Sequence, residues 1–322
     1  MEQKLVSTIK KLSKNSEYDC LLMFSGGKDS SYLLYYLSEV LKLKVASFTL
    51  THKFMSKATL ENVSGFAEKY SKKHFVIENE YLNKAGNHFL ENWINKPDEG
   101  SLITLCTGCR LGLIKLVIET AKKENINVVV TGLTPFEATD FRMKLVNYPK
   151  GKEGKFYFLL GYLRLVLRNP SLVKNPKVLR DQVMEYYYFN KQKDLYSKNG
   201  IHYVKPFYDY LKYDEAEVVE TLKKLNWQKA PISGNSFWRA DCDMNALRQY
   251  FHYKISGYNE QKYYYGQMLD QGLITQDYYD NTVQDFDQTE GVKKIIRSSG
   301  ISAKAVEKYE KYLASENGRN KN

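Results

Sequence analysis

A short apolar run over residues 19–24 leads directly into two adjacent glycines, Gly26 and Gly27, and this succession limits the fold more than any other feature of the chain. Short, continuous apolar runs are typical of buried parallel strands. Over residues 30–41 the apolar positions recur every three or four residues, which predicts an amphipathic helix, and residues 44–50 form a second predicted strand. Strand, glycine turn, helix and strand together predict one βαβ unit.

The alternation of helix and strand patterns continues along the first half of the chain. Residues 59–72 and 111–123 are predicted helices, whereas residues 74–77 and 127–131 are predicted strands. This alternation predicts an α/β fold with a doubly wound, Rossmann-like parallel sheet.

The chain of 322 residues has the length of about two domains. We expect an α/β domain over residues 1–147, a basic helical insertion over residues 148–199, the completion of the α/β domain over residues 200–242 and a mainly helical region over residues 243–322. Within the third part, residues 214–225 form a predicted helix with Asp and Glu in its first turn, where the helix dipole favours negative charge.

The composition indicates where in the cell the protein is expected and which partners its charge allows. Four cysteines are too few for a disulfide framework and the lysine-rich N-terminus lacks the apolar core of a signal peptide, so we expect a cytoplasmic protein. The longest apolar run, over residues 156–167, is too short to cross a bilayer. The net charge of +11 is spread along the chain without a ribonucleoprotein motif, so an RNA partner is allowed but not favoured.

The segment between the first strand and the first helix has the composition of a phosphate-binding loop. Two glycines permit a tight turn that brings backbone N–H groups close to a ligand, and a helix N-terminus offers free donors to phosphate. The spacing from glycine to lysine is too short for the loop of ordinary nucleoside triphosphatases. The residues of the segment are Ser25, Gly26, Gly27, Lys28, Asp29 and Ser30.

This SGGKDS segment resembles in full the SGGxDS motif of the PP-loop ATP pyrophosphatases, a Rossmann-like superfamily of adenine nucleotide alpha hydrolase-like proteins. The resemblance implies that ATP, with Mg²⁺, is cleaved between its α- and β-phosphates, that AMP is transferred to an oxygen of an acceptor, and that a nucleophile then displaces AMP. It further implies that Lys28 offsets the charge of pyrophosphate and that Asp29 holds Mg²⁺ or orients the loop. The residues expected to cradle pyrophosphate are Ser25, Gly26, Gly27 and Ser30.

Two further ligand positions are expected at the carboxyl ends of strands, where doubly wound sheets bind ligands. In this superfamily the end of the second strand lies against adenine, so the backbone near Phe48 and Thr49 is the expected base site. The resemblance also implies a glycine close to the ribose and acidic residues near the metal. The corresponding residues of this chain are Thr131, Gly132, Glu137 and Asp140.

Three cysteines form a second candidate site. Cys106 and Cys109 lie just before a predicted helix, beside Arg110, and both a helix N-terminus and a neighbouring cation lower the pKa of a thiol. A lone C-x-x-C pair is a weak metal signal, and Cys242 is the candidate third ligand. Three roles stay open: ligands of Zn²⁺ or of a [4Fe-4S] cluster, as in some sulfur-transferring PP-loop enzymes, a redox or persulfide-carrying pair, and structural thiols.

The second half of the chain resembles the N-acetyl sugar amidotransferase branch of the superfamily, which serves lipopolysaccharide and related glycan pathways. The matching stretches are residues 204–227, 233–241 and 255–280. The resemblance implies that an amide or carboxyl oxygen of a nucleotide-linked sugar is adenylated and that ammonia, delivered by a separate glutaminase subunit, displaces AMP. The residues expected to bind this acceptor are Arg142, Arg239 and Asp241.

Two alternatives to nitrogen transfer stay open. The N-terminal cysteine cluster of the amidotransferase branch is missing, and the trio Cys106, Cys109 and Cys242 is similar to that of thiolating relatives. Sulfur insertion into a tRNA base or a small metabolite, with a sulfur donor such as a cysteine desulfurase, is therefore one alternative. A nucleotide-binding module without turnover is the other, and a homodimer is compatible with all three.

Overall fold

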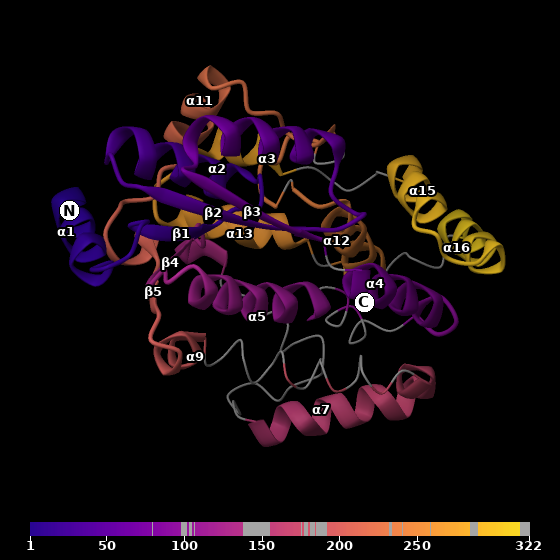
Figure 1. The fold of residues 1–322 in the computed structure, drawn as a ribbon. Helices are drawn as coiled ribbons and strands as arrows, with labels where there is room; N and C mark the ends of the chain where they lie inside the picture. Colours follow the sequence, from indigo (N-terminus) through magenta and orange to yellow (C-terminus); the bar gives the residue numbers. More distant parts are fainter. Residues whose placement is uncertain are drawn as a thin grey trace.

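Five parallel strands form a single sheet in the order β3-β2-β1-β4-β5 (Figure 1). Every neighbouring pair in this order is parallel, which confirms the predicted doubly wound α/β fold. The strands are β1 (Cys20–Met23), β2 (Val45–Thr51), β3 (Lys73–Glu78), β4 (Val128–Thr131) and β5 (His202–Val204).

The structure is a computed structural model. It describes residues 1–78, 80–97, 102, 105, 107–137, 155–174, 176, 180, 184, 192–231, 234–239, 241–257, 259–283 and 289–315. Cys106, Asp140 and Arg142 lie outside these residues. Of the predicted insertion, α7 (Lys155–Arg168), the 3₁₀ helix η4 (Pro170–Lys174) and α9 (Gln192–Lys198) are described.

The sheet register brings the carboxyl ends of β1 and β4 together, beside the middle of β2. Met23, the last residue of β1, pairs with Phe48 of β2 on one side and with Thr131 of β4 on the other. The chain moves outward from β1 to β2 and β3, and then crosses back to β4 on the opposite side. The strand order therefore reverses between β1 and β4, and such a switch point is where doubly wound sheets bind ligands.

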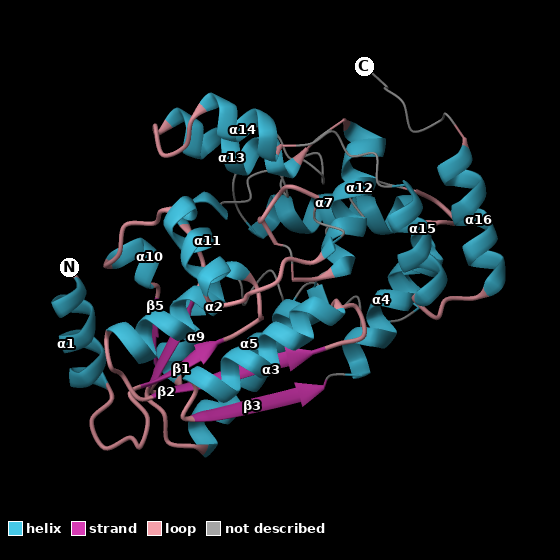
Figure 2. Ribbon diagram, turned by 90° about the horizontal axis from the view of Figure 1, so that it is seen from above, coloured by secondary structure: helices cyan, strands magenta, loops and turns pink. Residues whose placement is uncertain are grey.

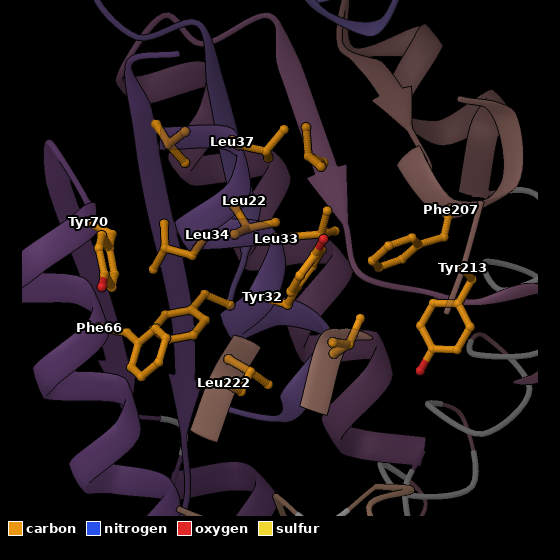
Figure 3. Close-up of a cluster of buried hydrophobic side chains, with 14 of the residues drawn as sticks. Leu22, Tyr32, Leu33, Leu34, Leu37, Phe66, Tyr70, Phe207, Tyr213 and Leu222 are labelled. Atoms are coloured by element: carbon orange, nitrogen blue, oxygen red, sulfur yellow. The ribbon is translucent and has the colours of Figure 1, made fainter. Parts of the chain in front are cut away.

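Side chains of β1 alternate between the two faces of the sheet, as strand geometry requires. Leu22 belongs to the cluster beneath α2 (Lys28–Tyr35), α3 (Lys57–Tyr70) and α11 (Glu215–Lys224), where Figure 3 shows it close to Leu33 and Leu34. Leu21 faces the opposite cluster, with Val117 of α5 (Thr107–Lys123) and Tyr196 of α9. Helices thus cover both faces, and Figure 1 shows α2 and α3 on one side and α5 on the other.

The helix after the glycine turn differs from the prediction at both ends. It begins at Lys28 and its last part, η1 (Tyr36–Val40), is a π-helix, in which the turn is wider than in an α-helix. The Ser38 hydroxyl donates to the carbonyl of Leu34 at 2.7 Å, a bond that competes with regular helical pairing.

A separate helical cluster lies at one end of the sheet (Figures 1 and 2). It joins α4 (Glu80–Trp93) to three C-terminal helices, α12 (Asp243–Ser256), α15 (Thr289–Ser298) and α16 (Ala303–Ala314). At its centre the Trp93 ring lies 4.3 Å from that of Phe251 and 5.8 Å from that of Tyr309. The mainly helical C-terminal region predicted from the sequence is thus observed, and α4 packs with it.

Five further helices are described. They are α1 (Glu2–Leu12), η3 (Pro135–Glu137), α10 (Pro206–Asp209), α13 (Glu260–Asp270) and α14 (Gln276–Thr282). Across the described part of the chain, no helix combines the length and the apolar character needed to span a membrane.

Candidate functional site

The SGGKDS segment turns between β1 and α2 at the switch point of the sheet. Gly26 adopts a left-handed backbone with φ of +78°, which L side chains rarely adopt. A Cβ atom at Gly26 would lie 2.7 Å from Cγ2 of Val63 and 2.8 Å from the carbonyl oxygen of Thr59. Only glycine fits this position, because both the backbone angle and the neighbouring α3 exclude a side chain.

The hydroxyls of the two serines form hydrogen bonds with backbone groups of the same segment. The Ser30 hydroxyl accepts from the Ser25 amide at 3.2 Å and donates to the Gly27 carbonyl at 3.1 Å. The Ser25 hydroxyl accepts from the Gly27 amide at 3.3 Å. Gly27 is the N-cap of α2, and no side chain caps that helix. The serine hydroxyls thus shape the turn, while the N-terminus of α2 keeps the unpaired amides that a helix start presents.

The segment after α11 also fixes the turn, through hydrogen bonds from Trp227 and Gln228. Trp227 Nε1 donates to the Gly26 carbonyl at 2.9 Å, and the indole is 8% exposed. Asn62 of α3 exchanges two hydrogen bonds with the backbone of Gln228, of 2.7 and 2.9 Å. These bonds fix the carbonyl side of the turn.

The end of β4 reaches the same turn, as the sequence predicts for Thr131 and Gly132. A Cβ atom at Gly132 would lie 3.1 Å from the backbone nitrogen of Ser30. Thr131 is 6% exposed in β4, directly before this contact. Glycine at 132 therefore allows the loop after β4 to touch the first turn of α2. Contact of this glycine with a ribose stays a prediction.

Lys28 does not project into open space. Its ammonium lies 2.8 Å from both carboxylate oxygens of Asp29 and donates to the Tyr213 hydroxyl at 2.6 Å. Glu215, at the start of α11, lies 3.2 Å away, and the Lys28 and Glu215 side chains are 2% and 0% exposed. Burial alone would lower the pKa of Lys28, but the carboxylates of Asp29 and Glu215 hold that pKa well above its usual value.

This arrangement gives the lysine a structural role. That its charge also offsets pyrophosphate stays a prediction; in the structure the ammonium is paired with the carboxylates of Asp29 and Glu215. Glu215 is in turn bonded by the hydroxyl of Tyr278 at 3.0 Å and by that of Tyr264 at 3.4 Å. The ammonium therefore joins the loop to α11, α13 and α14.

Glu215 and Tyr213 are residues that sequence reasoning missed. Their only signal was their place within residues 204–227, one of the stretches that resemble the amidotransferase branch. Tyr213 also donates to Asp29 Oδ1 at 2.8 Å, so it holds the carboxylate that the sequence assigns to Mg²⁺.

Three further predicted residues gather around the turn. A Cβ atom at Gly27 would lie 3.1 Å from Asp241 Oδ2, and Arg239 lies 3.6 Å from the Glu137 carboxylate. Burial raises the pKa of Glu137, Arg239 opposes that rise, and the negative charges of Asp29 and Asp241 add to it. Arg239 has a left-handed backbone with φ of +47°, which is rare for arginine. The structure thus brings Glu137, Arg239 and Asp241 to the loop.

The expected base site lies within the sheet, and a base contact there stays a prediction. Phe48 and Thr49 lie in the middle of β2, and both are 0% exposed. The Phe48 carbonyl accepts from the Phe24 amide at 2.8 Å, and the Thr49 hydroxyl donates to the Phe24 carbonyl at 2.6 Å. These groups therefore join β2 to the end of β1.

The cysteines are only partly described. Cys109 and Cys242 are half-buried, and they pack against different apolar clusters. Cys20 is fully buried in β1, and burial raises the pKa of its thiol. Among the described residues no group of three His, Cys, Asp or Glu side chains is arranged to hold a metal ion.

Comparisons with known sequences find partial relatives and no matching family model. The chain is 30% identical over 129 residues to a 7-cyano-7-deazaguanine synthase of Clostridium acetobutylicum, covering 38% of this chain and 57% of that protein. It is 28% identical over 120 residues to the synthase of Clostridium botulinum, covering 35% and 54%. An uncharacterized protein of Methanocaldococcus jannaschii is 26% identical over 130 residues, covering 40% and 43%. The chain spans about half the length of these relatives.

Three solved structures are similar to this chain at low sequence identity. An NMN synthetase from Francisella tularensis is 14% identical with a TM-score of 0.43, covering 94% of this chain and 95% of that one. A U34-tRNA thiolase from Methanococcus maripaludis, solved with its [4Fe-4S] cluster, is 14% identical with a TM-score of 0.40, covering 99% and 90%. An NH3-dependent NAD synthetase from Campylobacter jejuni is 18% identical with a TM-score of 0.33, covering 69% and 90%.

Proposed function

We propose that this chain, whose loop and sequence relatives both support membership of the PP-loop ATP pyrophosphatase superfamily, is an enzyme that converts ATP to AMP and pyrophosphate. One observation carries the proposal: the N-terminus of α2, which no side chain caps, follows the two-glycine turn at the switch point, and Gly132 after β4 packs against its first turn. Helix N-termini with free amides and a positive dipole end are suited to phosphate oxygens.

The proposed reaction has two steps. An amide or carboxyl oxygen of the acceptor attacks the α-phosphorus of ATP, and the bond to the β-phosphate breaks, which releases pyrophosphate. Ammonia then attacks the activated carbon and loses a proton, and AMP leaves with the original oxygen. We propose a nucleotide-linked N-acetyl sugar as the acceptor and a separate glutaminase as the source of ammonia.

The position of the resembling stretches supports nitrogen transfer. Each of the three stretches that are similar to N-acetyl sugar amidotransferases supplies side chains to the surroundings of the turn. They are Tyr213 and Trp227 from residues 204–227, Trp238 and Asp241 from residues 233–241, and Tyr264 and Tyr278 from residues 255–280.

The described residues suggest distinct tasks. The amides at the start of α2 would bind the pyrophosphate part of ATP. Mg²⁺ is commonly held by one or two carboxylates together with substrate phosphates, and Asp29 and Asp241 are the carboxylates beside the turn that fit this role. The guanidinium of Arg239 would orient an anionic group of the acceptor, with Glu137 fixing its position.

The test supplies nitrogen-15 ammonium, Mg·ATP and a panel of nucleotide-linked N-acetyl sugars that carry a carboxyl or amide group. We expect equal amounts of AMP and pyrophosphate, together with one nitrogen-15 atom in the product by mass spectrometry. ADP and phosphate as products would contradict the pyrophosphatase assignment. Sulfide-dependent AMP formation that is lost in Cys242→Ala would instead favour thiolation.

A further inference from the structure

Helix α7 displays a row of leucines on the outside of the molecule. Their exposed fractions are 51% for Leu159, 37% for Leu160, 54% for Leu163 and 70% for Leu167. At 100° per residue these four side chains occupy about a quarter of the helix circumference. We call these four residues the leucine stripe.

The rest of the helix explains why the stripe points outward. Gly161 and Leu165 are buried, with Leu165 only 3% exposed, so the opposite face packs on the protein. Arg164 and Arg168 are exposed along one flank of the stripe. Figure 1 shows α7 beyond α5, on the side away from the sheet. The helix thus lies along the surface with an apolar face outward and cations beside it.

The sequence that contains the stripe carries charge of one sign. Residues 155–180 contain six basic residues and no acidic one, although the whole chain has 37 acidic residues in 322. Such a stretch attracts an anionic surface, because basic residues next to a bilayer each favour binding to anionic lipid.

We propose that α7 docks this protein on the surface of an anionic lipid bilayer, lying in the plane of the membrane. The leucine stripe would enter the boundary between headgroups and acyl chains, and Arg164 and Arg168 would extend to the lipid phosphates. A lipid surface fits better than a protein partner for two reasons. One helix face is smaller than a stable protein interface needs, and leucine is under-represented among the residues that dominate such interfaces. The docking does not depend on the proposed reaction.

The experiment measures co-sedimentation of the full chain with vesicles of phosphatidylcholine alone or mixed equally with phosphatidylglycerol. We expect binding to the mixed vesicles that is at least about tenfold stronger than to the neutral ones. The double variant Leu163→Glu/Leu167→Glu should lower binding to mixed vesicles by about tenfold or more. The matched control is Leu60→Glu on α3, where the leucine is 42% exposed and distant in sequence, and it should bind like the wild type.

A second pair of variants separates charge from apolar contact. Arg164→Gln/Arg168→Gln should remove most of the preference for anionic vesicles, by about tenfold. Far-UV circular dichroism and melting temperature should match the wild type in every variant, because all the substituted side chains are exposed. Failure of the wild type to bind mixed vesicles, or an equal loss in Leu60→Glu, would overturn the proposal. A wild-type dimer that the leucine variants convert to a monomer, without vesicle binding, would show a protein interface instead.

Discussion

The ammonium of Lys28 and the carboxylate of Glu215 lie 3.2 Å apart, and both side chains are excluded from water. One belongs to the glycine turn after β1 and the other to the first turn of α11, far along the chain. The contact ties the loop to helices that carry much of the resemblance to amidotransferases. It also means that loop geometry and fold stability depend on the same buried charges.

Removing the Glu215 charge should destabilise the fold. Breaking a buried ion pair by deleting one partner costs about 3–5 kcal/mol, and Asp29 remains to pair with Lys28, so we expect Glu215→Gln to lose about 2–4 kcal/mol. Urea unfolding followed by circular dichroism measures this change. Glu220→Gln is the matched control, because the Glu220–Lys224 pair is exposed on the same helix, and we expect it to leave the unfolding midpoint almost unchanged. Equal effects of the two variants would show that Glu215 contributes no more than a surface charge.

Alanine at Gly26 or Gly132 should weaken nucleotide binding. At Gly26 the new Cβ meets Val63 at 2.7 Å, and at Gly132 it meets the Ser30 nitrogen at 3.1 Å, so each variant displaces the turn. We expect the rise in melting temperature caused by Mg·ATP to be reduced or lost, since a ligand stabilises only the state that binds it. Gly266→Ala is the control because a Cβ there meets nothing within 4 Å. A full ATP-induced shift in both loop variants would refute the assignment of the turn.

Stability should fall as the pH decreases below about 6.5, in part through His252. Burial lowers the pKa of this imidazole despite the neighbouring Glu260, to which its Nδ1 lies 2.5 Å away. The unfolded chain therefore binds a proton at His252 that the folded chain resists, and stability is lost by up to about 1.4 kcal/mol per pH unit for one such group. In His252→Gln the amide can still donate to Glu260 but does not titrate. Unfolding free energies between pH 7 and 5 should thus vary less steeply in this variant, and an unchanged slope would contradict the prediction.

The protein purified without oxygen should contain no iron–sulfur cluster if nitrogen is the atom transferred. Cys109 and Cys242 pack against separate apolar clusters, which favours structural roles for these two thiols. Iron, zinc and sulfide analysis with an absorption spectrum provides the measurement. Amounts of iron and labile sulfide that correspond to about one cluster per chain would instead support thiolation as the reaction.

Local pattern was sufficient to predict the elements that build the loop. The apolar run before the glycines forms β1, and the residues after them, which are apolar at every third or fourth position, form α2. Burial of one face of an element sets the spacing of its apolar residues, so such elements can be predicted from the sequence. Gly132 was expected beside a ligand, from the rule that ligands bind beyond strand ends, and the structure places it against the first turn of α2.

Long-range pairing was not predictable in this way. The helix dipole alone accounts for an acidic residue at position 215, because acidic side chains are favoured in the first turn of a helix. The sequence therefore gave no reason to pair Glu215 with Lys28. Phe48 and Thr49 were expected near the end of the second strand, whereas β2 extends to Thr51 and the Thr49 hydroxyl bonds within the sheet. The packing of α4 with the C-terminal helices likewise depends on partners far apart in the chain.

The central claim is that the turn after β1 binds the pyrophosphate part of ATP. Isothermal titration of the wild-type protein with Mg·ATP, alone and in saturating Mg·pyrophosphate, tests it without knowledge of the acceptor. We expect one ATP site per chain and competition from pyrophosphate, with both ligands lost in Gly132→Ala and kept in Gly266→Ala. Absence of ATP binding, or ATP binding that pyrophosphate does not reduce, would contradict the claim.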